Sequence, residues 1–405
     1  MRRARTESPQ GAAVAVGIER HLRLTRRLAW ACFWLAAVSR AEPTSDAAIL
    51  GPSSQSARID EFRLRLTSFY QDGHGYQSKA GPVAGPGSER TLIVQPMMLV
   101  GIRQTPRIHH EVVIPIDVVS AASANALDVV SHASAVNEAI GIELTSRFEL
   151  SDDDQLTSNI TWHEEEPFGS GSFGLGYSHA MADDNAVLGI SAQATFDRFD
   201  NLLPDGGRHG RRNRTALNGN LNFLQLLSPT TVFDASYGLT FQQGTLETTY
   251  NSVPMADGVN RSNELFPHTR TRHAMQARVA QHLPASHTTL RASYRYYTDS
   301  FRLDAHTAEF ELHQYLLPRL IARGSFRYYT QTGVDFFSTA LPWQESPLGP
   351  RTADSDLARF HAREYGLKLL WLARGQSSLD IGYFHYFRDN GLHANVLSFG
   401  YGGGF

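Results

Sequence analysis

Polar and apolar residues alternate along residues 288–331. In the first part of this stretch Leu290 and Tyr294 fall on one side, whereas Arg291 falls on the other. Side chains of a β-strand point to opposite faces with a period of two, whereas a helix would repeat apolar residues at i, i+3, i+4 and i+7. The pattern therefore predicts antiparallel strands with one apolar, aromatic face and one charged face.

The same alternation continues over most of residues 59–405 and predicts strands of about 9–13 residues, the length that crosses a membrane at a tilt. Breaks near residues 105, 152, 184, 229, 285, 318 and 375 are short, and the breaks between them are mostly longer. Short turns on one side and long loops on the other are typical of an outer-membrane barrel. Seven short turns predict an all-β, closed antiparallel transmembrane β-barrel of about 16 strands, because backbone groups in lipid must all be paired. A large soluble β-sandwich or barrel is the alternative.

Arg and Glu residues recur on neighbouring strands of the predicted charged face. A ring of Arg around a water-filled lumen favours anions. Facing Arg and Glu side chains also stabilise one another, so the same residues could form a self-neutralising ladder inside a blocked interior. The sequence leaves both interpretations open. The candidate lumen-lining residues are Arg270, Arg272, Arg278, Arg291, Arg295, Glu309, Glu311, Arg323 and Arg327.

A pattern rich in Ser and Ala begins at Asp117 and recurs at Asp128. Small side chains allow close packing, but few residues here are large enough to fill a core. A compact loop and a loop folded into a hollow interior both fit this composition. The second interpretation predicts that residues 118–137 plug or narrow the lumen.

The N-terminus resembles a secretory signal. An apolar run over residues 28–38 follows Arg26 and Arg27, and residues 39–41 offer a cleavage site with small residues. A short membrane anchor is the alternative. We predict a signal peptide over residues 1–41, a disordered leader over 42–58 and the barrel over 59–405. Cleavage would remove Cys32, the one cysteine, so no disulfide is expected in the mature chain.

The net charge and the C-terminal residue each add an expectation about partners. Removing residues 1–41 takes away eight Arg and two Glu and changes the formal net charge from −3 to −9, which argues against a nucleic-acid partner. Phe405 ends an alternating final segment, and a terminal aromatic residue there resembles the signal that the barrel-assembly machinery reads. The lipid bilayer and lipopolysaccharide are the other expected partners, and the basic segment 208–214 is interpreted as a loop that contacts lipopolysaccharide phosphates or is simply solvated.

Signals for chemistry are weak. His109 and His110 are adjacent, so on a strand they point to opposite faces and cannot share a metal. The acidic turns at 152–154 and 183–184 could attract calcium, but solvated acidic turns are common. The chain has no nucleophile elbow, phosphate loop or dinucleotide fingerprint. We expect no catalytic residue, cofactor or metal site. A barrel phospholipase would need Ser, His and a carboxamide or carboxylate on one outer face, and no set stands out in the sequence.

One family resemblance appears in residues 294–299, 306–309 and 327–337, and in the pair 119–123 and 130–134. These segments resemble an uncharacterised bacterial outer-membrane β-barrel family, domain-of-unknown-function family 3570. The resemblance covers most of residues 60–405 and departs at residues 246–250, which read Leu-Glu-Thr-Thr-Tyr. It implies the fold and a place in the bacterial outer membrane, and no activity.

The functional hypothesis is a porin-like passive channel. The first alternative is a structural or docking barrel for a periplasmic or lipoprotein partner, for instance in envelope electron transfer. The second alternative is an outer-membrane hydrolase.

Overall fold

The computed structural model describes residues 57–72, 91–121, 136–165, 168–202, 208–247, 252–255, 261–338, 349–373 and 376–404. Residues 60–405 cluster as one unit. The predicted signal peptide, nearly all of the predicted leader and Phe405 lie outside the described residues, so those expectations stay predictions.

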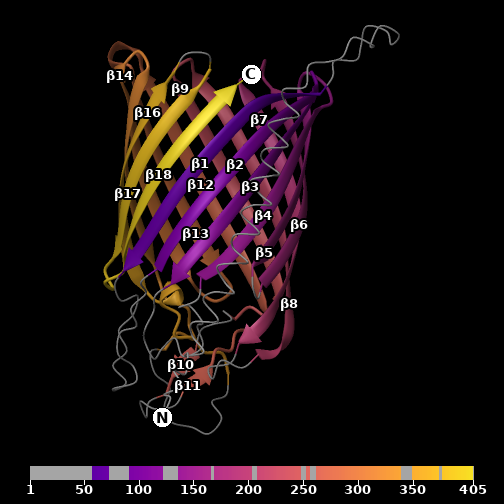
Figure 1. Cartoon of the computed structure of the whole chain (residues 1–405), viewed down its shortest axis with the longest axis vertical. Helices are drawn as coiled ribbons and strands as arrows, with labels where there is room; N and C mark the ends of the chain where they lie inside the picture. The colour runs from indigo at the N-terminus through magenta and orange to yellow at the C-terminus, as the bar shows by residue number, and fades with distance from the viewer. Residues whose placement is uncertain are drawn as a thin grey trace, which may run out of the picture. The chain divides into compact units, whose positions relative to one another are not determined.

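Sixteen strands of the described chain form a closed antiparallel barrel (Figure 1). Each strand pairs with its neighbours along the chain, except that β9 pairs with β12 across the small sheet of β10 (Ser252–Pro254) and β11 (Arg261–Asn263). β1 and β18 close the barrel, with Glu61 opposite Gly404 and Asp72 opposite His393. The prediction of a closed barrel is confirmed. The strands are β1 (Arg58–Asp72), β2 (Thr91–Thr105), β3 (Ile108–Ala121), β4 (Val136–Glu149), β5 (Asp154–Glu165), β6 (Phe168–Met181), β7 (Ala186–Leu202), β8 (Arg208–Ser228), β9 (Thr231–Gly244), β12 (Thr269–Leu283), β13 (Thr288–Asp299), β14 (Asp304–Leu317), β15 (Leu320–Gln331), β16 (Phe360–Leu372), β17 (Ser378–Arg388) and β18 (His393–Gly404).

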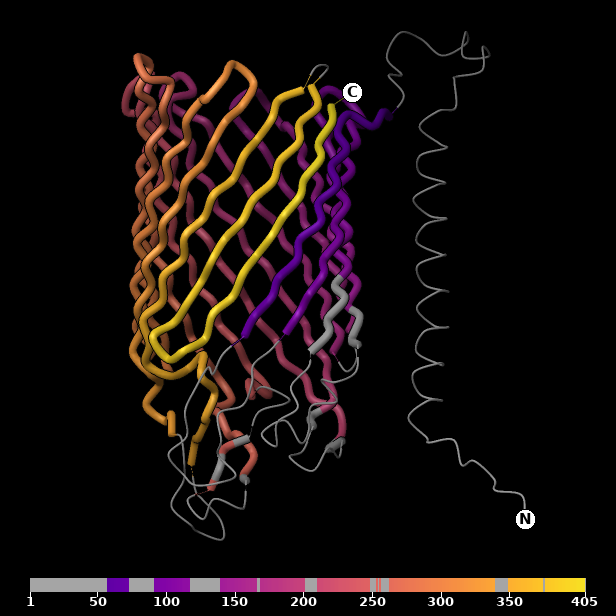
Figure 2. The backbone as a smooth tube through the Cα atoms, turned by 60° about the vertical axis from the view of Figure 1, so that its left-hand side comes forward, coloured from indigo at the N-terminus to yellow at the C-terminus, as the bar shows by residue number. Residues whose placement is uncertain are grey.

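The two ends of the barrel differ, as Figure 2 shows. At one end, called here the turn end, seven connections of two to five residues join the strands at the predicted positions. β1 begins and β18 ends there. At the other end, the loop end, four of the eight connections are long and four have five residues or fewer. Long and short connections are therefore equally frequent at the loop end, where mostly long ones were expected.

Two details of the wall correct the sequence-based expectations. The strands have 11 to 21 residues; six of them have the predicted length and the other ten are longer. The segment 208–214, predicted as a loop, belongs to the 21-residue strand β8, in which Arg214 lies opposite Asp197 of β7. Basic side chains do not interrupt a backbone ladder, so the strands continue beyond the length needed to cross lipid.

Pro96 and Pro115 both lie inside strands, and the β2–β3 ladder skips Gln95 and Pro96 because proline has no N–H to donate.

The outer face of the wall is apolar. Alternate residues around the barrel expose large apolar side chains, for instance Ile190 (61%), Phe310 (56%) and Leu367 (57%). A soluble protein rarely exposes a contiguous apolar surface of this extent. In a closed barrel such a surface meets hydrocarbon. The long-stranded soluble alternative is therefore not supported. Among the described residues, no helix is long and apolar enough to cross a membrane.

A small apolar core lies at the loop end. Phe266 from the β9–β12 connection packs with Phe301 and Leu303 from the β13–β14 connection and with Val334 from the β15–β16 connection. Backbone bridges join Leu265 to Arg351 and Phe337 to Thr352. The three connections thus form one packed structure beside β12 to β16, which we call the loop core.

Candidate functional site on the charged inner face

The strand registers bring the predicted charged residues together on one face of β12 to β15. Arg291 lies directly opposite Glu311, and Glu309 lies directly opposite Arg327. Exposed apolar residues such as Phe310 occupy the alternate positions. Because the apolar face is the outer one, the Arg and Glu side chains point to the barrel interior.

Glu311 is the centre of a group of cations halfway along the wall. Its carboxylate forms ion pairs with Arg323 and with Arg291, whose Nη1 lies 3.5 Å from Oε2. His313 Nε2 lies 3.0 Å from the same carboxylate. Three basic side chains from β13, β14 and β15 thus share one acid, so the charges of this part of the face are partly compensated.

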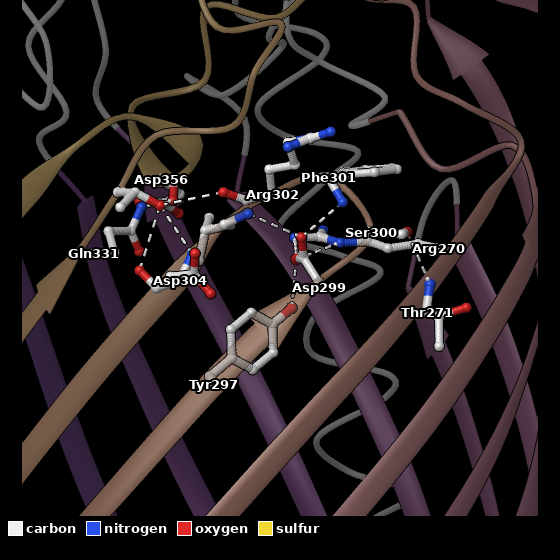
Figure 3. A network of polar contacts seen from close by, with 12 residues as sticks. Arg270, Thr271, Tyr297, Asp299, Ser300, Phe301, Arg302, Asp304, Gln331 and Asp356 are labelled. Atoms are coloured by element: carbon white, nitrogen blue, oxygen red, sulfur yellow. Dashed lines mark hydrogen bonds and ion pairs between the residues drawn. The ribbon is translucent and has the colours of Figure 1, made fainter.

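Asp299 organises a second group at the loop end (Figure 3). Its side chain is fully buried and pairs with Arg270, which is 10% exposed. The Tyr297 hydroxyl donates to Oδ2 at 2.7 Å, and the backbone N–H groups of Phe301 and Leu303 donate to Oδ1 at 2.8 and 3.2 Å. The Arg270 guanidinium also lies 4.4 Å from the centre of the Phe301 ring. Arg270 is therefore a structural residue that ties β12 to the loop core.

The other two candidates on β12 differ from each other. Arg278 pairs with Asp234 of β9, with Nε 2.5 Å from Oδ2. Arg272 lies opposite Asp299 in the register, yet its buried Nε has no hydrogen-bond partner within the described chain. Arg272 thus sits beside a carboxylate that is already saturated by Arg270, Tyr297 and backbone groups.

Arg295 and Arg327 lie between these two groups. Within the described residues neither guanidinium forms a hydrogen bond or an ion pair, and the same holds for Glu309 and for Glu364 of β16, which flank Arg327 in the cross-strand row. The central part of the face therefore carries two Arg side chains whose charge no carboxylate neutralises directly.

The described residues line two cavities. One of about 380 Å³ lies toward the loop end and is lined by Arg327, Tyr329, Gln331, Phe360, Glu364 and Arg388, among others. The other, of about 990 Å³, lies toward the turn end, between β1 to β5 and β16 to β18. Its lining has six Arg or Lys residues and four Asp or Glu residues, so it is moderately basic. Asp60 holds Arg103 at 2.9 Å there, and Asp380 holds Lys368 at 2.8 Å.

Comparison with known families identifies the chain. The family described as "Protein of unknown function (DUF3570)" matches residues 170–400, which is more than half of the chain. The chain belongs to this family. The match runs from β6 to β18, so it begins later than the expected resemblance over most of residues 60–405. The Ser/Ala-rich repeats of the DUF3570 chain at 119–123 and 130–134 lie outside the matched range.

Several solved barrels are similar to the DUF3570 chain. Pseudomonas aeruginosa OpdK, crystallised with vanillate, has 9% identity and a TM-score of 0.43 over 87% of this chain and 99% of its own. A bacterial polysaccharide outer membrane secretin has 10% identity and a TM-score of 0.46, with 87% of this chain and 100% of the secretin covered. The siderophore receptor PirA from Acinetobacter baumannii has 9% identity and a TM-score of 0.44 over 80% of this chain and 52% of the receptor. A comparison with curated proteins found no match.

The family and the architecture together place the DUF3570 chain in the bacterial outer membrane. An even number of antiparallel strands, complete closure and an apolar outer belt are the features that this membrane requires. The similarity to the solved barrels concerns the fold alone.

The structure also brings together a set of residues that the sequence did not mark. On the outer face near the turn end, Ser146 Oγ lies 2.8 Å from His110 Nδ1, and His110 Nε2 lies 2.7 Å from Gln104 Oε1. His109 points the other way, toward Asp60, as the alternation predicts. Ser146 and His110 are 36 residues apart and meet only because they are partners in the β3–β4 register. No sequence signal could have selected this pair.

The acidic turn at 152–154 is engaged in local contacts. Asp154 accepts hydrogen bonds from the Ser151 hydroxyl at 2.6 Å and from Tyr177, and lies 2.9 Å from His179 Nδ1. Within the described part of the chain, no three His, Cys, Asp or Glu side chains group as a metal site.

Proposed function

We propose that the DUF3570 barrel is a passive channel with a water-filled lumen lined by Arg and Glu. The observation that carries the proposal is the pair of guanidiniums outside any ion pair among the described residues, Arg295 and Arg327, on the inner face of a sixteen-strand wall between the Glu311 group and the loop end. Barrels of this size leave room for an aqueous channel. The cavity of about 380 Å³ beside Arg327 supports the same view.

The charges predict a weak preference for anions. Within β12 to β16 of the described chain, three Arg side chains of the predicted lumen, Arg272, Arg295 and Arg327, form no ion pair, and two carboxylates of the same region, Glu309 and Glu364, form none either. Screening at physiological salt acts over about 8 Å, so one excess charge shifts the ion ratio and does not exclude cations. The Glu311 group is already compensated and contributes less.

Conductance in planar bilayers tests this proposal. The purified full chain should show steps of conductance and a reversal potential on the anion side in a salt gradient. The double substitution Arg295→Gln and Arg327→Gln should move the reversal potential toward cations and leave the step size within about twofold, because the pore width is little changed. Arg302→Gln is the control, because Arg302 is an exposed loop residue paired with Asp335. An unchanged reversal potential in the double variant would refute the assignment of these residues to the lumen.

The plug hypothesis applies to a shorter segment than the sequence indicated. Of residues 118–137, the first four end β3 and the last two begin β4, where they pair in the wall. Residues 122–135 lie outside the described residues, and we propose the plug for this part alone. Deleting them should raise the conductance per step, and an unchanged conductance would remove the plug from the proposal.

A second candidate function follows from the Ser146, His110 and Gln104 set. With Gln104 Oε1 accepting from Nε2–H, His110 Nδ1 is free to take the Ser146 proton. The Ser146 oxygen would attack the ester carbonyl of a lipid, the proton would pass through His110 to the leaving alcohol, and water would release the fatty acid. A fluorophosphonate probe should then label the folded chain, and Ser146→Ala should abolish labelling. Absence of labelling in the unmodified chain would exclude this activity.

A further inference from the structure

Three consecutive hairpins joined at the loop end carry the same polar contact on the outer face; their strands are β9 and β12, β13 and β14, and β15 and β16 (Figure 1). In each, a tyrosine hydroxyl on the first strand lies 2.7–3.1 Å from Nδ1 of a histidine on the second. The ring centroids are 6.1–6.3 Å apart and the rings are inclined by 19–31°. The pairs are Tyr237 with His273, Tyr294 with His306, and Tyr328 with His361. We call them the tyrosine–histidine belt.

Two of the three pairs lie at the edge of the apolar surface, whereas the Tyr237 pair lies deeper, because the exposed Leu239 and Phe241 follow it toward the loop end of β9. His306 is the third residue of β14 and His361 the second of β16, and both are exposed. On the same strands and the same face, Phe310 and Tyr365 follow toward the middle of the barrel. This is the level at which hydrocarbon gives way to lipid headgroups.

The direction of each hydrogen bond sets where the histidine carries its proton. With the phenol as donor to Nδ1, the tautomer on which the belt rests, the neutral imidazole holds its proton on Nε2. Within the described residues no group accepts a hydrogen bond from Nε2 of His273, His306 or His361. With this tautomer each pair presents an N–H donor that no described group uses, and in the pairs of His306 and His361 this donor lies at headgroup level.

Neighbouring charges favour an anionic partner at one end of the belt. Arg363 follows His361 on the same face, is exposed and lies 6.0 Å from the Phe387 ring centre. Two carboxylates, Asp304 and Asp389, also lie near the belt and keep their negative charge: Asp304 accepts the Tyr296 hydroxyl at 2.9 Å, and Asp389 accepts the His361 backbone N–H at 3.1 Å. Neither carboxylate contacts a belt imidazole among the described residues, unlike Asp154, which contacts that of His179.

We propose that the belt binds the phosphate groups of a phosphorylated glycolipid in the leaflet at the loop end. Phosphate oxygens are strong acceptors and bind N–H donors and guanidinium groups in preference to neutral acceptors. Successive pairs lie two strands apart, about 10 Å at the usual strand spacing, so a headgroup with more than one phosphate can contact two pairs. The orientation assumed is that of outer-membrane barrels, whose long loops face the exterior.

Two other outer-face histidines show what the belt requires. His385 Nδ1 and the Tyr383 hydroxyl both contact Asn395 Oδ1, at 2.9 and 2.7 Å, so His385 donates from Nδ1 and its neutral Nε2 carries no proton. His179, at the turn end, contacts the Asp154 carboxylate, which repels phosphate. Neither histidine belongs to the belt.

Lipid binding by the purified, folded full chain tests the proposal. Native mass spectrometry would follow titration with diphosphoryl lipid A, with its dephosphorylated form and with phosphatidylglycerol. The triple substitution His273→Gln, His306→Gln and His361→Gln should weaken binding of diphosphoryl lipid A about tenfold, because charge-assisted hydrogen bonds are lost, and should leave the dephosphorylated form unaffected. His179→Gln should bind like the unmodified chain.

Several results would overturn the proposal. These are unchanged binding in the triple variant, an equal loss for both forms of lipid A, an equal loss for phosphatidylglycerol, or an equal loss in His179→Gln. A shift in gel mobility on heating shows that each variant is folded. If the triple variant does not fold, Arg363→Gln should still weaken binding of diphosphoryl lipid A about threefold, and no change there would also contradict the belt. The proposal does not depend on whether the lumen conducts.

Discussion

Two carboxylates on the inner face, Glu311 and Asp299, both pair with Arg side chains but differ in how deeply the pairs are buried. Glu311 lies halfway along the wall, and its Arg partners keep 32% and 44% of their side-chain surface exposed. Asp299 lies at the loop end, where it is fully buried and holds an Arg that is 10% exposed. The first group remains in contact with the interior, whereas the second is part of the packed structure.

The difference comes from the loop core and not from the strands. Asp299 receives two backbone N–H groups from the turn that follows β13, and its partner Arg270 stacks on Phe301 of the same turn. Glu311 has only side-chain partners from the wall itself. A buried ion pair with saturated hydrogen bonds is costly to break, whereas an accessible pair contributes little to stability. Charges near the loop core therefore stabilise the fold, and charges halfway along the wall remain partly exposed on the inner face.

Asp299→Asn should have the largest effect on stability. It keeps the shape of the side chain but leaves Arg270 buried without a counter-charge, which costs about 3–5 kcal/mol when a buried pair loses one partner. Urea-induced unfolding in lipid vesicles measures the change in the free energy of unfolding. The loops that surround Phe301 should also become sensitive to protease.

Asp335→Asn is the matched control for Asp299→Asn. Asp335 also pairs with an Arg at the loop end, at 3.0 Å from Arg302, but both side chains are largely exposed. Exposed pairs contribute roughly 0–1 kcal/mol. If the two substitutions destabilised the barrel equally, burial would not be the property that separates the two kinds of charge.

The strands and the faces of their side chains could be predicted from the sequence. The contacts that these side chains form could be predicted only in part. The period of two at Leu290, Arg291 and Tyr294 assigns faces without any knowledge of register, because every residue of a strand alternates. The facing of Arg291 and Glu311 also follows once β13 and β14 are taken as a hairpin. These inferences need only local pattern and antiparallel order.

The contacts around Asp299 could not be predicted from the sequence. Arg270 is 29 residues from Asp299 in the sequence. Its contact depends on the loop core, which contains Phe266 and Val334 from connections without a regular hydrophobic pattern. The alternation placed Arg270 and Arg295 together among the lumen-lining candidates. Only the structure shows that Arg270 is in an ion pair, whereas Arg295 is in none within the described chain. The belt was missed for a similar reason, since each tyrosine–histidine pair depends on the register across a loop.

Glu311→Gln should destabilise the barrel less than Asp299→Asn does and should change its ion selectivity more. Arg291, Arg323 and His313 would lose their shared acid, but the two Arg side chains remain partly hydrated, so we expect a cost of about 1 kcal/mol. The loss of one negative charge should move the reversal potential in planar bilayers further toward anions. A destabilisation as large as that of Asp299→Asn, with no change in selectivity, would contradict the contrast between the two carboxylates.

The most direct test of the account is the accessibility of two adjacent positions, Tyr294 and Arg295. The one natural cysteine, Cys32, can be replaced by Ser, so single substitutions Tyr294→Cys and Arg295→Cys provide unique thiols. In lipid vesicles a charged, water-soluble thiol reagent should label the cysteine at position 295 rapidly and spare the one at position 294, because water fills the inside of the barrel and hydrocarbon covers the outside. Equal labelling of the two positions, or labelling at 294 alone, would contradict the assignment of the faces.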